Sequence, residues 1–209
     1  MSATSMTLYY NSASPFARKV LVLLHETEQT SRVSLKAVSP TPVSPDNELI
    51  QENPAGKLPA LRLADGNVLH DSRVILDYLD HQHVGNALIP REGSARWRRL
   101  TLASLADALL DAALLIRYET FLRPAEKQWR EWLDNQQEKI TRSLLYFEQE
   151  AVTELSSNFD IASISVAAAL GYLDFRQPDL NWRSSYPRLA AWYYEVSQRP
   201  SMIETQPPA

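Results

Sequence analysis

The 209-residue chain contains no cysteine. This absence excludes disulfides, iron–sulfur ligation, cysteine–zinc sites and a cysteine nucleophile within the chain. No stretch of 18 or more residues is continuously apolar, so no membrane-spanning helix and no membrane partner are expected. The first ten residues lack the basic and apolar regions of a signal peptide, which makes the cytoplasm the expected location.

An excess of positive charge is missing as well. The formal net charge is −4, from 21 basic and 25 acidic side chains, and this balance argues against a nucleic-acid partner. The cluster of Arg96, Arg98 and Arg99 is therefore interpreted as a solvated helix face. His81 and His83 would point to different faces of a predicted helix, so no metal site is expected.

The first 83 residues alternate short strands and short helices. The pattern predicts strands over residues 7–10, 33–38, 59–63 and 68–70, and helices over residues 15–26, 47–52 and 72–81. This order, βαβαββα, needs one parallel crossover and one hairpin, with Asp65-Gly66-Asn67 as the hairpin turn. The expected fold of this part is a small mixed α/β sheet with helices on both faces.

From residue 94 onward, helical periodicity replaces the strand patterns. Long helices are predicted over residues 96–121, 125–153, 160–175 and 187–198, and the third is expected to be the buried centre of an all-α bundle. Residues 84–93 are the predicted linker, and the tail from Pro200 is expected to be irregular. The predicted domains are thus residues 1–83 and 94–209.

Ser14 and Pro15 follow the first predicted strand and open the first predicted helix. Serine is a favourable N-cap and proline a favourable first helical residue, so capping alone explains both. A second interpretation is that the Ser14 hydroxyl faces a bound thiol, because unpaired N–H groups at a helix N-terminus favour a thiolate. The two are compatible, since a hydroxyl can accept one hydrogen bond and donate another. Tyr10 and Ser12 are nearby alternatives for this contact.

The segment Asn53-Pro54-Ala55-Gly56-Lys57-Leu58-Pro59 leads into the third predicted strand. A proline that opens a strand is ordinary by itself. A cis Leu58–Pro59 bond would turn the backbone groups of Leu58 outward, where an extended peptide ligand could pair with them. Because only about 5–6% of such bonds are cis, the residues alone leave this open.

Asp71 and Ser72 lie where a predicted strand ends and a helix begins. Both residue types cap helices well, which is one interpretation. The other is an anion site, in which Ser72 holds a carboxylate at the helix N-terminus and Asp71 pairs with an ammonium group. Ser157 and Asp160, before the third long helix, fit the spacing of a capping box and are interpreted as structural.

These four segments, in this order, resemble the glutathione transferase family, serine-type, and in particular its bacterial members of the YibF type. The matching residues are Ser14 with Pro15, Phe16 and Arg18, the segment 53–59, the pair 71–72 and the segment 157–160. The resemblance extends over almost the whole chain. It departs in Asp71, where the family more often has glutamate, and the missing cysteine closes thiol–disulfide exchange.

The resemblance implies a thioredoxin-like domain that binds glutathione, followed by an all-helical domain that supplies the pocket for a small hydrophobic electrophile. It implies that Ser14 donates a hydrogen bond to the glutathione sulfur and that Leu58, before a cis Pro59, pairs with the cysteinyl backbone. Asp71 and Ser72 would hold the γ-glutamyl end, and Lys57 would reach the glycyl carboxylate. The expected protein is a homodimeric detoxification enzyme that uses glutathione as co-substrate.

The second-substrate pocket and the activity itself have alternatives. Candidates for the pocket are Arg117, Tyr118, Phe121, Arg123 and Arg176, which core packing or ion pairs explain about equally well. A rival hypothesis is a binding protein of the same fold, such as the stringent-starvation-type adaptors that bind RNA polymerase. Intact segments 53–59 and 71–72 favour glutathione binding over that hypothesis. A glutathione-dependent isomerase of the zeta type ranks lowest, because its S-S-C-S signature is absent.

Overall fold

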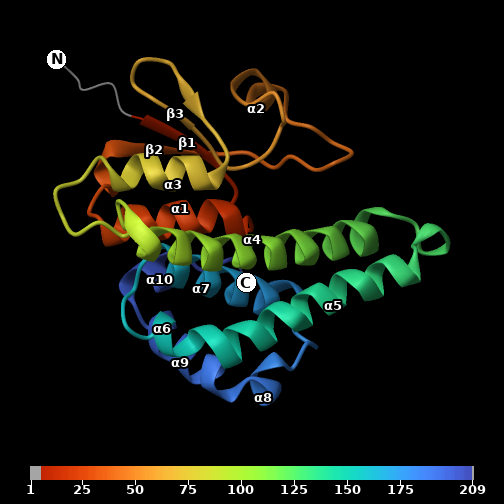
Figure 1. The fold of residues 1–209 in the computed structure, drawn as a ribbon. Helices are drawn as coiled ribbons and strands as arrows, with labels where there is room; N and C mark the ends of the chain where they lie inside the picture. The colour runs from red at the N-terminus through yellow and green to blue at the C-terminus, as the bar shows by residue number, and fades with distance from the viewer. Residues whose placement is uncertain (1–5, 209) are drawn as a thin grey trace. The chain divides into compact units, whose positions relative to one another are not determined.

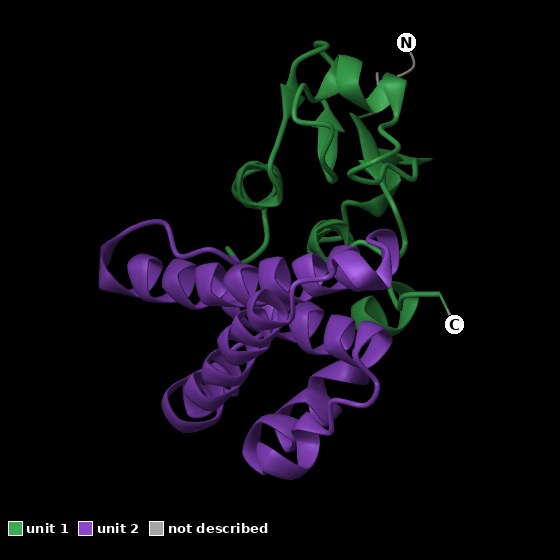
Figure 2. Cartoon of the chain, turned by 90° about the vertical axis from the view of Figure 1, so that its right-hand side faces the viewer, with its two compact units in different colours: residues 1–87, 200–209 green, residues 88–199 purple. Residues whose placement is uncertain are grey.

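The computed structural model describes residues 6–208, which form two compact units (Figure 2). Of these residues, 6–87 and 200–208 belong to unit 1, and 88–199 form unit 2. The sequence analysis assigned the last ten residues to the helical domain, but their short helix α10 (Pro200–Glu204) packs on α1 (Pro15–Glu26) in unit 1.

Unit 1 holds a four-stranded mixed sheet with the strand order β2-β1-β3-β4 (Figure 1). The strands are β1 (Met6–Tyr10), β2 (Val33–Ala37), β3 (Ala60–Arg62) and β4 (Val68–Leu69). β1 and β2 are parallel, whereas β3 is antiparallel to both β1 and β4. The expected crossover and hairpin are therefore confirmed, and each predicted strand end lies within a single residue of the observed one.

Alternation along β1 places different side chains on the two faces of this sheet. On one face, Tyr9 forms a small core with Leu49 of α2 (Asn47–Glu52) and Ala60 of β3. Leu8 is fully buried on the other face, where α1 and α3 (Ser72–Asp80) pack on each other (Figure 1). The expectation of helices on both faces is thus confirmed.

The C-terminal helix is anchored by Arg18 of α1, which is only 4% exposed. Its Nη2 donates to the Met202 carbonyl at 3.0 Å and its Nε to Thr205 Oγ1 at 3.4 Å. The expectation of an irregular tail was therefore wrong at α10. The tail forms a helix there because the buried Arg18 guanidinium donates to the Met202 carbonyl, which lies near the end of the helix.

Unit 2 is all-helical over the residues that the structure describes. Its main helices are α4 (Gly93–Leu122), α5 (Arg130–Tyr146), α6 (Val152–Leu155), α7 (Ile161–Arg176), α8 (Trp182–Ser185) and α9 (Pro187–Ser197). Every residue from Ile161 to Leu173 is buried, which confirms that α7 is the centre of the bundle. It packs against both α4 and α9.

The single helix expected over residues 125–153 is wrong. The segment instead contains a 3-10 turn at Ala125–Lys127, helix α5 and a π-helical turn at Phe147–Ala151. Gln128 accounts for the first interruption, because its side-chain amide donates to the carbonyls of Thr120 and Arg123 at the end of α4. Its own backbone is extended, so the helix restarts only at Arg130.

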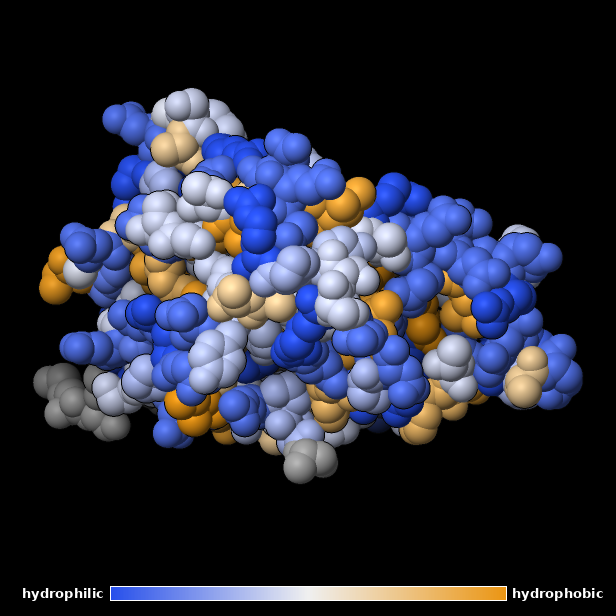
Figure 3. Space-filling view, turned by 90° about the horizontal axis from the view of Figure 1, so that it is seen from below, coloured by the Kyte–Doolittle hydropathy of each residue, from blue (hydrophilic) through white to orange (hydrophobic). Residues whose placement is uncertain are grey.

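No helix among residues 6–208 is both long and apolar enough to cross a membrane. On the face shown in Figure 3, hydrophobic side chains form separate patches between hydrophilic ones. Apolar residues are concentrated in the interior of each unit instead, as Leu8 and Ala167 illustrate at full burial.

Candidate functional site

The three segments singled out in the first domain meet at one edge of its sheet. Tyr9 of β1 pairs with Ala60 of β3, so the end of β1 lies beside the start of β3. Leu61 of β3 pairs with Leu69 of β4, so β4 ends at the same edge. The segments brought together there are residues 11–14, 53–59 and 71–72.

Ser14 lies in a turn between β1 and α1 that Asn11 organises. Asn11 Oδ1 accepts from the Ala13 N–H at 2.9 Å, and its Nδ2 donates to the Val38 carbonyl at 3.0 Å. The Ser14 N–H donates to the Asn11 carbonyl at 2.9 Å. The half-buried Ser14 hydroxyl caps α1 by accepting from the Ala17 N–H at 3.3 Å, as the sequence predicted. This bond leaves the proton of the hydroxyl free to be donated.

Asn53 shapes the second segment and was missed as a site residue. It is 2% exposed, accepts from the Ala55 N–H at 3.0 Å and donates to the Lys57 carbonyl at 2.8 Å. Its own carbonyl accepts from the Gly56 N–H at 2.8 Å. Gly56 has a φ of +61°, a conformation that favours glycine. An asparagine three residues before a glycine is a turn signal that could have identified this scaffold.

The Leu58–Pro59 peptide bond is cis, as the resemblance implied. Pro59 is buried, Leu58 is half-buried against the core around Tyr9, and the Lys57 side chain is exposed. Within residues 6–208, the backbone N–H and carbonyl of Leu58 take part in none of the hydrogen bonds observed. Such groups at the end of a strand suit pairing with an extended peptide.

Asp71 is the N-cap of α3 and accepts from the Arg73 N–H at 3.0 Å. The same carboxylate forms an ion pair with Arg73 Nη2 at 2.7 Å, so it is already engaged by one cation. Hydrogen bonds from Arg73 hold the pKa of Asp71 below its ordinary value against the opposing effect of burial, and the charge of Lys19 acts in the same direction as Arg73. Ser72 beside it is 2% exposed. The sequence analysis gave Arg73 no role.

Three of the second-substrate candidates in unit 2, Arg117, Tyr118 and Arg176, act on a fourth residue, Tyr172. Burial raises the pKa of Tyr118, and the charge of Arg176 opposes that rise. Burial likewise raises the pKa of Tyr172, while the charges of Arg176 and Arg117 oppose that rise. Arg123, a further candidate, forms an ion pair with Glu119 at 2.8 Å.

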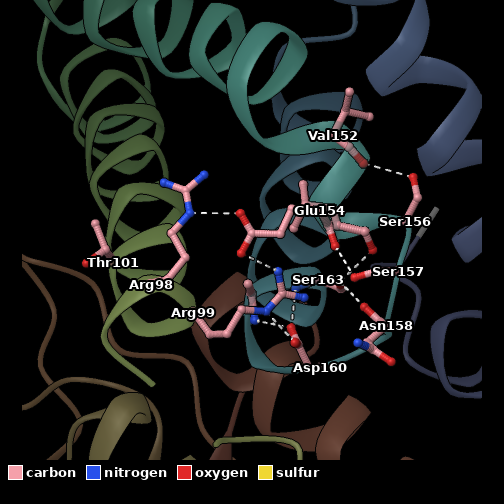
Figure 4. A network of polar contacts seen from close by, with 12 residues as sticks. Arg98, Arg99, Thr101, Val152, Glu154, Ser156, Ser157, Asn158, Asp160 and Ser163 are labelled. Atoms are coloured by element: carbon pink, nitrogen blue, oxygen red, sulfur yellow. Dashed lines mark hydrogen bonds and ion pairs between the residues drawn. The ribbon is translucent and has the colours of Figure 1, made fainter. Parts of the chain in front are cut away.

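The fourth segment is a folding element, although its cap differs from the one predicted. Asp160 is the N-cap of α7 and accepts from the Ala162 N–H at 2.9 Å. Ser157, predicted as the capping residue, instead donates to the Glu154 carbonyl at 2.7 Å. Asp160 also pairs with Arg99, and Arg99 Nη1 reaches Glu154 at 3.0 Å (Figure 4). The Ser157 expectation was wrong because the helix begins after Asp160 and leaves no N–H within reach of Ser157.

Residues 6–208 contain no group of three or more His, Asp or Glu side chains placed to hold a metal ion. The site in unit 1 consists instead of a hydroxyl, a free strand end and a charged helix cap. Together with the mixed sheet, these features define a thioredoxin-like domain, followed in the chain by a helical bundle.

Comparison with known proteins gives the family. Residues 13–82 match the glutathione S-transferase N-terminal domain, and residues 130–193 match the glutathione S-transferase C-terminal domain. The uncharacterized GST-like protein YibF of Escherichia coli (strain K12) is 34% identical over 205 residues, which are 97% of this chain and 99% of that protein. The chain belongs to the glutathione S-transferase family.

Two solved structures of a glutathione transferase family member from Pseudomonas fluorescens Pf-5 are similar throughout. One, with bound glutathione, is 65% identical and has a TM-score of 0.97. The other, with bound S-(propanoic acid)-glutathione, is 64% identical and has a TM-score of 0.93. Each comparison covers 98% of this chain and 100% of the other. These matches establish the fold class predicted from the sequence.

Proposed function

We propose that this protein is a glutathione transferase that stabilises the thiolate of bound glutathione with Ser14 and adds it to a small electrophile. The observation that carries the proposal is the meeting of three segments at one sheet edge. That edge offers a hydroxyl proton, a free strand end and a helix N-terminus, which match a thiol, a peptide backbone and a carboxylate. Binding of glutathione by the similar Pseudomonas protein supports it.

Each part of glutathione has its own partner in this proposal. The Leu58 backbone pairs with the cysteinyl residue, and the N-terminus of α3 at Ser72 holds the γ-glutamyl carboxylate. The Asp71 carboxylate accepts hydrogen bonds from the γ-glutamyl ammonium group as well as from Arg73. Lys57, whose side chain is exposed, reaches the glycyl carboxylate.

The role of Ser14 is electrostatic. A free thiol with a pKa near 8.5 is only about 3% ionised at pH 7, and lowering that pKa by about 2 corresponds to ~2.7 kcal/mol. A hydroxyl donor and the N-terminal end of α1 act on the same sulfur and together can supply a stabilisation of this size. The enzyme then positions the thiolate against the electrophile, which side chains of unit 2 bind, Tyr118 and Arg176 among them.

Calorimetric titration with reduced glutathione tests the binding part of the proposal. We expect a dissociation constant in the micromolar to low-millimolar range for the wild type. An Asp71→Ala/Ser72→Ala double variant should show no measurable binding. The Arg142→Gln variant, which breaks only an exposed pair with Glu138 on α5, serves as the matched control. Absence of wild-type binding at several millimolar would overturn the proposal and favour a non-catalytic adaptor.

Family membership supports two further parts of the proposal, a homodimeric assembly and a cytoplasmic location. Sedimentation velocity at micromolar concentration tests the first, with a particle of twice the chain mass as the expected result. A monomer at that concentration would contradict it.

A further inference from the structure

We propose that Arg176, Arg117, Tyr118 and Tyr172 form a carboxylate-binding site, so that the preferred electrophiles are anionic. These four residues, named here the arginine–tyrosine cluster, come from α4 and α7, which pack on each other in unit 2. The inference rests on the proposed function, because it specifies the substrate class of the same enzyme.

The cluster holds two guanidinium groups without a carboxylate partner. Within residues 6–208, neither Arg117 nor Arg176 forms an ion pair with Asp or Glu. Each lies over an aromatic ring instead: Arg117 is 3.7 Å from the ring centre of Phe121, and Arg176 is 3.8 Å from that of Phe175. Most arginines elsewhere in unit 2 are neutralised, as Arg183 is by Asp174.

One nitrogen in the cluster is both buried and without a partner. Arg176 Nε is shielded from solvent, and no atom in residues 6–208 accepts its hydrogen bond. A buried donor left unpaired costs on the order of 1–3 kcal/mol, more when the group is charged. Such atoms in a native protein call for an explanation, and a ligand that supplies the acceptor is one.

The two tyrosines add hydroxyl groups that can donate hydrogen bonds, as the guanidinium groups do. Burial raises the pKa of both Tyr118 and Tyr172, and both hydroxyls therefore remain protonated at neutral pH. The charged groups that act on these hydroxyls are Arg176 and Arg117, with no carboxylate among them. Two phenols and two guanidiniums form a set that provides donors and positive charge and lacks a negative group. An anion is the ligand that satisfies all of them.

A planar carboxylate fits this set best. Guanidinium groups bind carboxylates through two parallel hydrogen bonds, and the phenol donors can take the remaining lone pairs. The neighbouring rings of Phe121 and Phe175 offer apolar surface to the body of the electrophile. Because the proposed function assigns both carboxylates of glutathione to residues of unit 1, the anion bound here belongs to the electrophile.

A matched pair of substrates tests the inference: 4-chloro-3-nitrobenzoate and the neutral 4-chloro-3-nitrobenzamide. In both reactions the thiolate sulfur forms a bond to the ring carbon that carries chlorine, the C–Cl bond breaks, and chloride leaves with the bonding electron pair. The thiol proton passes to solvent. Dividing each kcat/KM by the uncatalysed rate constant removes the electronic difference between the two rings.

We expect the corrected kcat/KM ratio of benzoate to benzamide to fall roughly 10- to 100-fold in Arg176→Gln, mainly through KM. Arg176→Lys should recover part of the ratio, and Tyr118→Phe should lower it by less. The exposed-pair variant Arg142→Gln should leave the ratio unchanged. Equal ratios in wild type and Arg176→Gln would overturn the inference while leaving the transferase proposal intact.

Equilibrium binding separates this inference from the transferase proposal. Calorimetric titration of 4-chloro-3-nitrobenzoate, with the site of unit 1 saturated by S-methylglutathione, requires no turnover. We expect binding in the wild type and a loss of affinity of at least about 10-fold in Arg176→Gln. Lack of turnover with both substrates, combined with retained Arg176-dependent binding, would overturn only the transferase proposal. Binding that is indifferent to Arg176 would overturn the carboxylate site.

Discussion

The Ser14 hydroxyl accepts a hydrogen bond from the Ala17 N–H at 3.3 Å, and this contact caps α1. The bond occupies a lone pair of the oxygen and leaves its proton available. The same residue can therefore stabilise the helix and donate to a bound sulfur. The pH–rate profile distinguishes capping from thiol activation, because only loss of the donated hydrogen bond changes the pKa of the bound thiol.

We expect Ser14→Ala to lower kcat/KM with glutathione roughly 10- to 100-fold at pH 7, because a hydrogen bond to a charged sulfur is lost. The rate should recover at higher pH, with the half-maximal point raised by about 1 to 2 pH units as the bound thiol returns toward its ordinary pKa. Ser14→Thr keeps the hydroxyl and is the control. An unshifted pH–rate profile in Ser14→Ala would remove the catalytic assignment.

Asp71→Asn separates the charge of the helix cap from its hydrogen bond. Asparagine caps helices as well as aspartate does, so the melting temperature should change little. Glutathione affinity should fall about 10-fold, because the ammonium group loses a charged acceptor. Calorimetry and a thermal melt of the same sample check both expectations. A large loss of stability without a loss of affinity would make Asp71 a structural residue only.

Local signals explain why so much of the first domain was predictable. The cap at Ser14, the turn around Gly56 and the cap at Asp71 each depend on residues a few positions apart, and sequence spacing reports such geometry directly. The resemblance then placed these segments in one site. Their meeting at one sheet edge follows from strand register, which the hairpin turn at Gly66 helps to set.

Contacts between distant residues were not predictable in the same way. Arg18 and Met202 are 184 positions apart, and nothing in the spacing of α1 indicates a partner in the tail. The convergence of Tyr118, Tyr172 and Arg176 depends on the register between α4 and α7, and helical periodicity alone does not determine that register. Arg123, which the sequence analysis grouped with them, forms an ion pair with Glu119.

Removing the anchor of the C-terminal helix should destabilise unit 1. Arg18→Met keeps most of the buried volume but loses the bond to the Met202 carbonyl, which should cost about 1.5–3 kcal/mol. The α10 segment should also become more sensitive to proteases. Urea unfolding and limited proteolysis measure the two effects, with Arg62→Gln, an exposed pair with Glu52, as control. Unchanged cleavage after Glu204 by a glutamate-specific protease would contradict the anchoring role.

Asp160 caps α7 and neutralises the buried Arg99, and two substitutions distinguish these roles. Asp160→Asn keeps a capping oxygen and loses the charge, whereas Asp160→Ala loses both. We expect Asp160→Ala to destabilise the protein by roughly 3–5 kcal/mol. Asp160→Asn should destabilise it less, and the difference between the two variants should equal the capping contribution of ~1 kcal/mol. Urea midpoints measure the difference. Equal losses in the two variants would show that the charge alone matters.

Glu154 makes the stability of unit 2 depend on acid. Burial acts to raise the pKa of its carboxyl, but hydrogen bonds from Arg98 and Arg99 outweigh it and hold the pKa below its ordinary value of 4.5 (Figure 4). A carboxyl with a depressed pKa in the folded state stabilises the protein above its unfolded-state pKa and loses that contribution as the pH falls through the folded-state value. The loss should therefore occur below pH 4.5.

Thermal melts of wild type and Glu154→Gln between pH 7 and pH 3 measure this dependence. The variant should be less stable at pH 7, because Arg98 and Arg99 lose their charged acceptor. Its melting temperature should fall less steeply than that of the wild type below pH 4.5, so the two curves converge at low pH. Glu138→Gln, which removes an exposed pair with Arg142, should follow the wild-type slope. Parallel curves for wild type and Glu154→Gln would mean that other carboxyls determine the acid response, since removing this titration would then have changed nothing in that range.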